Sequence, residues 1–119
     1  MELLVRLNIL KDAGQISEET YKSLIKVIEM FSNKWGIALT EENGAMLITH
    51  LSTAIERIKK GNIIDGIDAQ VYKEIESHPS YEKCSKVIKD IEEQTEIKIP
   101  EGEETFIMMH LCTLFKTDL

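Results

Sequence analysis

The chain has 119 residues and a formal net charge of −7 at pH 7, with 14 Lys or Arg against 21 Asp or Glu. This length provides one domain, residues 1–119, and leaves no room for a second hydrophobic core. The 43% hydrophobic and 29% charged residues disfavour a disordered or membrane-spanning chain. The acidic balance disfavours direct nucleic-acid binding, which needs clustered Lys and Arg, and the 6% aromatic content disfavours a β-sandwich.

The two cysteines, Cys84 and Cys112, stand alone, without a CxxC motif or a metal-type spacing. Isolated thiols within apolar helical patterns are typical of reduced core residues in a cytosolic protein. The first ten residues lack the features of a signal peptide, and no apolar run approaches the roughly 20 residues of a membrane span. We therefore expect a cytoplasmic protein without a membrane partner.

Apolar residues recur at helical spacing in the first half of the chain, and typical caps bound each predicted helix. Glycines are expected to end the first three helices: Gly14, Gly36 and Gly61. Hydroxyl side chains are expected to cap the second and third helices: Ser17 and Thr40. The inward face of the second helix is predicted to carry Tyr21, Leu24, Ile25, Ile28, Phe31 and Trp35.

The second half of the chain is predicted to hold shorter helices separated by connectors. After a connector at residues 62–67, Asp68 is expected to cap a short helix. Pro79 breaks the chain, and Ser80 is expected to cap the next helix. Residues 97–100 read as an extended connector before a last helix from about residue 101 to residue 115. The predicted fold class is all-α, a compact bundle of five to six helices packed as antiparallel pairs.

His50 lies at the edge of the buried stripe of the third helix, and Arg57, seven residues further on, lies close to the same line. Histidine titrates near neutral pH without help and can act as a nucleophile. An imidazole at the rim of the core with a guanidinium on its own face suits transient phosphorylation. The guanidinium could then reach back to the phosphate oxygens as a bidentate fork.

His110 has a similar position on the last helix, and Glu103, seven residues earlier, lies near the same line. A carboxylate there could orient an imidazole N–H, most plausibly across a helix–helix contact. His78 differs, because it precedes Pro79 in a predicted turn and is expected to be exposed.

Ordinary structural roles compete with these interpretations. A histidine at the edge of a helix stripe is more often a half-buried residue with a common hydrogen bond than a functional one. No HxxxH, HExxH or Glu-x-x-His pair is present, so a metal site is disfavoured, and no cofactor loop or nucleophile elbow is found. Three methionines are expected to fill the core: Met46, Met108 and Met109. Three glutamates are expected to form a solvated helix face: Glu92, Glu93 and Glu96.

Three segments in order resemble the phosphotransferase-system regulation domain (PRD) family. The segment from His50 to Arg57 (HLSTAIER) is similar to the first histidine segment of that family. The segment from Glu103 to Leu111 (EETFIMMHL) is similar to the second, in which a Glu precedes the His by seven residues. Between them, VYKEI and HPSY are similar to the middle helix and its Pro–aromatic turn. The resemblance covers nearly the whole chain.

The resemblance implies a five-helix module that dimerises and responds to phosphorylation. The histidine phosphocarrier of the sugar phosphotransferase system, or a sugar-specific transport component, would phosphorylate His50 and His110. Arg57 and Glu103 would be their supporting residues, and His78 matches no phosphorylated position. The family often carries an Asp immediately before the first His, where this chain has Thr49. No catalytic residue, cofactor or metal is implied.

The predicted function is therefore a single-copy regulatory module, either standalone or an excised domain of a longer regulator with the standalone form favoured, that controls carbohydrate-operon expression or activity through protein contacts. The chain has no RNA-binding segment or helix-turn-helix of the kind that family regulators carry, so its output is expected to pass through a protein partner. The alternative is a helical interaction or dimerisation module that has kept the fold and lost the switch. An enzyme with a histidine base is disfavoured, because the sequence supplies no evident nucleophile or cofactor loop.

Overall fold

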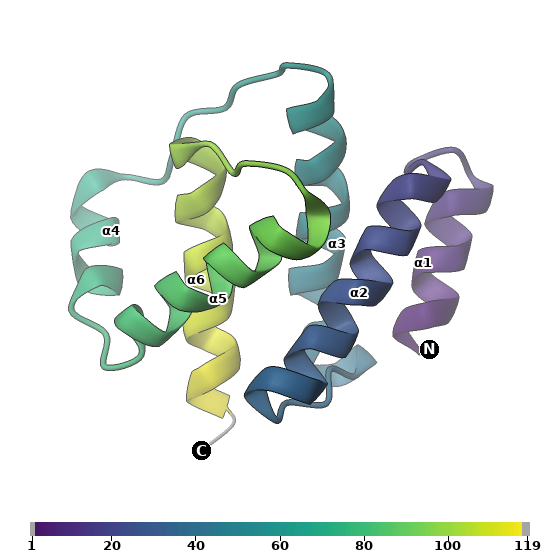
Figure 1. Cartoon of the computed structure of the whole chain (residues 1–119). Coiled ribbons are helices and arrows are strands. Elements are labelled where there is room, and N and C mark those ends of the chain that lie inside the picture. Colours follow the sequence, from purple (N-terminus) through teal and green to yellow (C-terminus); the bar gives the residue numbers. More distant parts are fainter. Residues whose placement is uncertain (1, 118–119) are drawn as a thin grey trace.

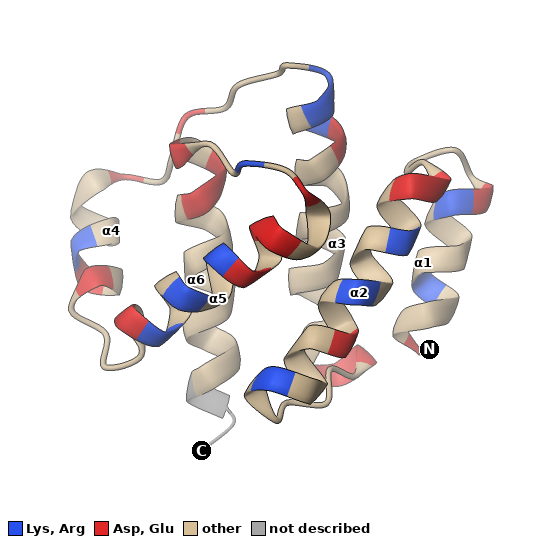
Figure 2. Cartoon of the chain, viewed as in Figure 1, with Lys and Arg blue, Asp and Glu red and all other residues tan. Residues whose placement is uncertain are grey.

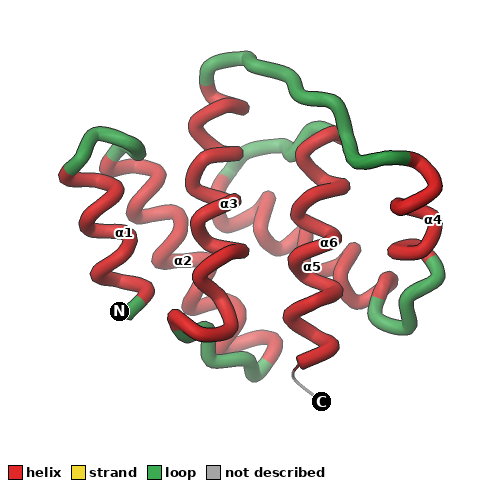
Figure 3. Tube along the Cα trace, turned by 180° about the vertical axis from the view of Figure 1, so that it is seen from behind, coloured by secondary structure: helices red, strands yellow, loops and turns green. Residues whose placement is uncertain are grey.

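Six α-helices account for the regular structure of residues 2–117, the part of the chain that the computed structural model describes (Figure 1). They are α1 (Leu3–Asp12), α2 (Glu18–Trp35), α3 (Glu41–Lys59), α4 (Ala69–Glu76), α5 (Tyr81–Thr95) and α6 (Glu101–Thr117). The all-α prediction is confirmed. Figure 3 shows α3 and α6 side by side and antiparallel, with α5 crossing behind them and α1 stacked against α2.

The predicted caps of α2 and α3 are present. Ser17 Oγ accepts a hydrogen bond from the backbone N–H of Thr20. Thr40 and Asn43 form a reciprocal capping box, in which each side chain accepts from the backbone N–H of the other residue. Gly36 follows α2 in the left-handed conformation, with φ of 67°, which an L side chain adopts only with strain. These caps satisfy backbone groups that a helix end would otherwise leave unpaired.

The start of α5 differs from the prediction. Asp68 caps α4 as expected, but the Ser80 side chain makes no cap hydrogen bond at α5. The backbone N–H of Ser80 instead donates to Nδ1 of His78, at 3.0 Å. His78 is half-buried, whereas the sequence predicted an exposed side chain, and its ring binds the backbone of the turn in which it lies.

The acidic face of α5 is also not wholly solvated. Glu92 is half-buried, and its Oε2 accepts from the backbone N–H of Ile99 at 2.7 Å. This bond ties the predicted extended connector to α5, so the connector is held although it belongs to no sheet.

The hydrophobic core lies between α2, α3, α5 and α6, and α1 adds Leu3 and Leu7 to it. The inward face of α2 is rotated from the prediction, because Val27 and Met30 are buried while Ile25 is only half-buried. The three helices that pack against α2 cover a wider arc than one apolar stripe. Within the described residues, no helix has the length and apolar character that a membrane crossing requires.

The methionines do not all fill the core. Met108 is fully buried, but Met46 is 74% exposed and Met109 is 36% exposed. Met46 lies four residues before His50, so helical geometry places it on the outer edge of α3 and away from the Leu47 stripe. The prediction of core filler is therefore wrong for Met46 and Met109.

Charged residues are interspersed over most of the surface, but the middle of the α3–α6 pair carries none (Figure 2). No Asp, Glu, Lys or Arg occurs at residues 43–55 of α3 or at residues 105–115 of α6. We call this stretch the uncharged seam. It is unusual in a chain of which 29% of the residues are charged, and both predicted phosphoacceptors lie within it.

Candidate functional site

The antiparallel packing of α3 and α6 brings His50 and His110 together. The two ring centroids are 5.2 Å apart, with an angle of 49° between the ring planes. Phe106, one turn before His110 on α6, also packs against His50, with a centroid distance of 5.8 Å. Two histidines from distant parts of the sequence thus form one cluster.

The two rings open onto a shallow pocket of about 440 Å³, which we call the histidine pocket. Its lining comes from α1, α3 and α6 and consists of Arg6, Ala45, Met46, Thr49, His50, Thr53 and His110. Among the residues that the structure describes, no carboxylate belongs to this lining. The pocket is therefore accessible from solvent, and its described lining contains one permanent cation and none of the negative charge that dominates the rest of the chain.

Below the pocket, Glu103 and Arg57 form a buried ion pair. The guanidinium donates twice to the carboxylate, from Nε to Oε2 and from Nη2 to Oε1, both at 2.9 Å. Glu103 is only 1% exposed, whereas the Arg57 side chain keeps 32% of its accessible surface. Burial of a carboxylate is costly unless it is paired, so this fork is what allows Glu103 to lie inside the fold.

Glu103 faces His50 of the neighbouring helix and not His110 of its own. Its Oε1 lies 3.7 Å from Nε2 of His50, slightly beyond hydrogen-bond distance. That Nε2 is buried and has no hydrogen-bond partner within the described residues. The contact across the helix pair involves the residues selected from the sequence, but Arg57 binds the carboxylate and does not reach back toward the pocket.

Both imidazoles are biased toward the neutral form. Burial lowers the pKa of His50, and the neighbouring His110 and Arg57 lower it further, while Glu103 opposes them. Burial likewise lowers the pKa of His110. A neutral imidazole carries a free lone pair, which is the form that attacks phosphorus or binds a proton.

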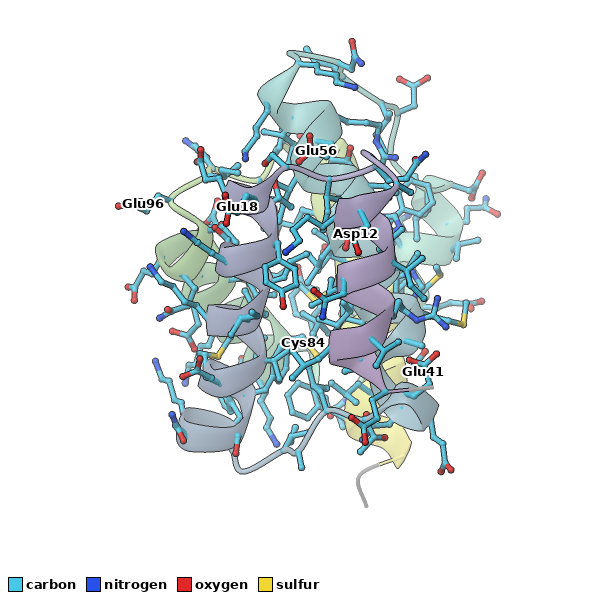
Figure 4. All side chains as sticks on the ribbon, turned by 90° about the vertical axis from the view of Figure 1, so that its right-hand side faces the viewer. Asp12, Glu18, Glu41, Glu56, Cys84 and Glu96 are labelled. Atoms are coloured by element: carbon cyan, nitrogen blue, oxygen red, sulfur yellow. The ribbon has the colours of Figure 1, made fainter. Side chains whose placement is uncertain are left out.

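Arg6 of α1 is a member of the site that sequence reasoning did not select. Its Nε donates to Oε1 of Glu41 at 3.0 Å, and its Nη1 approaches Oγ1 of Thr49 at 3.5 Å. Figure 4 shows Glu41 beside the first turn of α1, where it anchors this arginine. No local pattern connects residues so far apart in the sequence, so this contact could be found only from the fold.

The cysteines lie outside this cluster. Cys84 and Cys112 are buried free thiols with their Sγ atoms 3.8 Å apart, and Figure 4 shows Cys84 in the interior behind α1 and α2. Burial raises the pKa of Cys84 to about 12, so its unreactive thiol form predominates. In the part of the chain that the structure describes, no three His, Cys, Asp or Glu side chains are grouped so that they could hold a metal ion.

Comparison with known proteins assigns the family. The family model of the PRD domain matches residues 25–113, a segment that contains both histidines, Arg57 and Glu103. The chain belongs to the PRD domain family. The resemblance drawn from the histidine segments is thereby confirmed at the level of the family.

A relative of this PRD domain occurs in Escherichia coli (strain K12). It is the uncharacterized protein YhfY, which is 22% identical over 110 residues, and the alignment covers 92% of each chain. No solved structure gives a significant match. The comparison therefore identifies a related protein of similar length and adds no information about activity.

Proposed function

We propose that this PRD domain is a regulatory module phosphorylated on His50 and His110 by components of the sugar phosphotransferase system. It controls carbohydrate-operon expression or activity through protein contacts and is not an enzyme. The observation that carries the proposal is the His50–His110 cluster at a solvent-accessible pocket without a carboxylate among its described lining residues, in a chain of this family. The proposed phosphoryl donor is the histidine phosphocarrier or a sugar-specific transport component, and the proposed location is the cytoplasm.

The proposed reaction is transfer of one phosphoryl group between imidazoles. The lone pair of a neutral ring nitrogen attacks phosphorus, the N–P bond of the donor phosphohistidine breaks, and the proton of the new imidazolium passes to the departing imidazole. The lowered pKa values of His50 and His110 keep this lone pair available near pH 7.

The two histidines are not equivalent as acceptors. Nε2 of His50 is buried against Glu103, so Nδ1 is the nitrogen of that ring that can react without separating α3 from α6. A phosphoryl group on Nδ1 makes Nε2 more basic, so after the transfer the ring can take up a proton from solvent at Nε2, which the Glu103 carboxylate stabilises as a hydrogen-bonded ion pair. The buried carboxylate thus acts as a positioning group for the phosphorylated form of His50.

The proposed output is a change in the protein–protein contact that covers the uncharged seam. A phosphoryl group adds about −1.5 to −2 charges. Placed in the pocket that the exposed Met46 lines, and on helices whose exposed apolar side chains include Met109, that charge disfavours an apolar contact and weakens or rearranges it. We propose that this contact is formed with a second copy of the chain, as a homodimer, and that the signal passes to a partner protein without direct contact to nucleic acid.

Reconstitution with the phosphorelay proteins and their phosphate donor tests the proposal. Acid-labile phosphate is expected on His50 and His110, and His50→Ala and His110→Ala each remove one site. His78→Ala is the matched control, because His78 lies outside the histidine pocket, and its labelling is expected to be unchanged. Absence of label on both His50 and His110 refutes the proposal and favours an interaction module without a switch. That module also predicts an unchanged oligomeric state when both histidines are replaced.

A further inference from the structure

The histidine pocket contains a cation, the guanidinium of Arg6, to which no function has yet been assigned. Among the described lining residues, Arg6 is the one with a permanently positive side chain, and it reaches the pocket from α1. We propose that Arg6, together with the Thr49 hydroxyl, binds the phosphoryl group carried by His50 or His110. This inference rests on the proposed function and names the residues that hold the transferred group.

Arg6 has N–H donors that do not bind Glu41 and that could bind a phosphoryl group. Its fork toward Glu41 uses Nε and Nη2, and Nη1 is engaged only by a long contact of 3.5 Å to Thr49 Oγ1. A guanidinium has five N–H donors, so those on the Nη1 edge can turn to phosphate oxygens while Glu41 remains bound. Thr49 Oγ1 accepts from Arg6, which leaves its own O–H free to donate to the same oxygens.

The other arginine of the site is poorly suited to this task. Arg57 donates from two nitrogens to Glu103, which is 1% exposed. Moving Arg57 to a phosphoryl group would leave a buried carboxylate without its partner, at high cost. The partner of Arg6 is much less costly to share, because the Glu41 side chain keeps 22% of its accessible surface and can be hydrated.

The charges around the pocket agree with an anionic occupant. Glu41 and Glu103, two carboxylates from the packed helices, are each neutralised by an arginine, and the described lining residues include no acid. In a chain of net charge −7, such a place offers a dianion an environment without local repulsion. Arg6 lies outside the segment matched by the family model, so this contribution belongs to α1 of the present chain.

Chemical phosphorylation with phosphoramidate tests the inference without any partner protein. In this reaction the imidazole nitrogen forms a bond to phosphorus, the P–N bond of phosphoramidate breaks, and ammonia leaves with the imidazole proton as ammonium. The variants are Arg6→Gln, Arg6→Lys and Thr49→Val, with Lys11→Gln as the matched control for loss of one cation from α1. The full chain is used, and circular dichroism establishes that each variant is folded.

Two measurements report binding of the phosphoryl group. The apparent KM for phosphoramidate is expected to rise about tenfold in Arg6→Gln, because charge-assisted hydrogen bonds are lost, and less in Arg6→Lys and Thr49→Val. In ³¹P NMR, the titration midpoint of the phosphohistidine is expected to rise in Arg6→Gln, because the nearby cation stabilises the dianion. Lys11→Gln is expected to match the wild type in both measurements.

The outcomes separate this inference from the proposed function. Relay labelling of His50 or His110, with a wild-type KM and ³¹P midpoint in Arg6→Gln, overturns only the assignment of Arg6. Failure of relay labelling, with phosphoramidate labelling that depends on Arg6, overturns only the proposed function. Absence of chemical labelling on both histidines overturns the assignment, because the pocket then holds no phosphoryl group.

Discussion

Replacing Arg57 by Met tests the buried ion pair at the base of the site. The substitution keeps an apolar stem of similar reach and removes the fork that holds the Glu103 carboxylate. Glu103 is 1% exposed and cannot rehydrate, so we expect Arg57→Met to lower the free energy of unfolding by about 3 kcal/mol at pH 7. In Glu103→Gln, the arginine left behind is 32% exposed and rehydrates, so the expected loss is only about 1 to 2 kcal/mol.

Urea denaturation of the two single variants and the double variant measures the coupling between them. The Arg57→Met/Glu103→Gln variant is expected to be more stable than Arg57→Met alone, because no charge is then left buried. Arg6→Met serves as the control for removing a partly exposed arginine, and we expect its midpoint to stay close to that of the wild type. A double variant less stable than Arg57→Met, or a larger loss in Glu103→Gln than in Arg57→Met, would refute the reasoning.

Three further predictions concern stability. Gly102→Ala is expected to cost about 3 kcal/mol, seen as a lower Tm, because its Cβ would lie 2.1 Å from the Ile64 carbonyl oxygen, which is backbone and cannot turn aside. Gly36→Ala meets no atom within 4 Å and is expected to cost only about 1 kcal/mol from its positive φ, so equal losses would contradict this ranking. The lowered pKa values of His50 and His110 mean that the unfolded chain binds more protons, so stability should fall as pH drops through 6.5, the ordinary value. As the pH is lowered from 8 to 5, the urea midpoint should therefore decline less steeply in the His50→Gln/His110→Gln variant than in the wild type.

Local signals were sufficient for the helices, because caps and glycines act within a few residues. Ser17, Thr40 and Asp68 cap the helices that the sequence predicted for them. Ser80 does not: its side chain makes no cap hydrogen bond, and its own backbone N–H donates to the ring of His78 instead. The inward face of α2 was misjudged for a different reason: the positions of its neighbours, and not its own periodicity, decide which residues are covered.

The site was only partly accessible to sequence reasoning. His50 and His110 stand out because each lies at the edge of an apolar stripe, and their meeting follows once α3 is known to pack against α6. Arg6 could not be identified, because its contact with Thr49 spans 43 positions and depends on where α1 stacks. The exposure of Met46 was missed because its residue type favours the core, whereas its position on α3 does not.

The register of α3 against α6 explains why the histidines and the ion pair belong together. Arg57 follows His50 by seven residues, and Glu103 precedes His110 by seven, so each step is about 10.5 Å along its helix. In an antiparallel pair these steps run in the same direction, and packing that brings His50 to His110 therefore also brings Arg57 to Glu103. The Arg57–Glu103 pair fixes the register at one level, while the pocket two turns away stays open and has no carboxylate among its described lining residues. Under the proposed function, a phosphoryl group adds charge at the open level without breaking the closed one. Phosphorylation then changes the protein–protein contact over Met46 and Met109, while the α3–α6 pair itself remains folded.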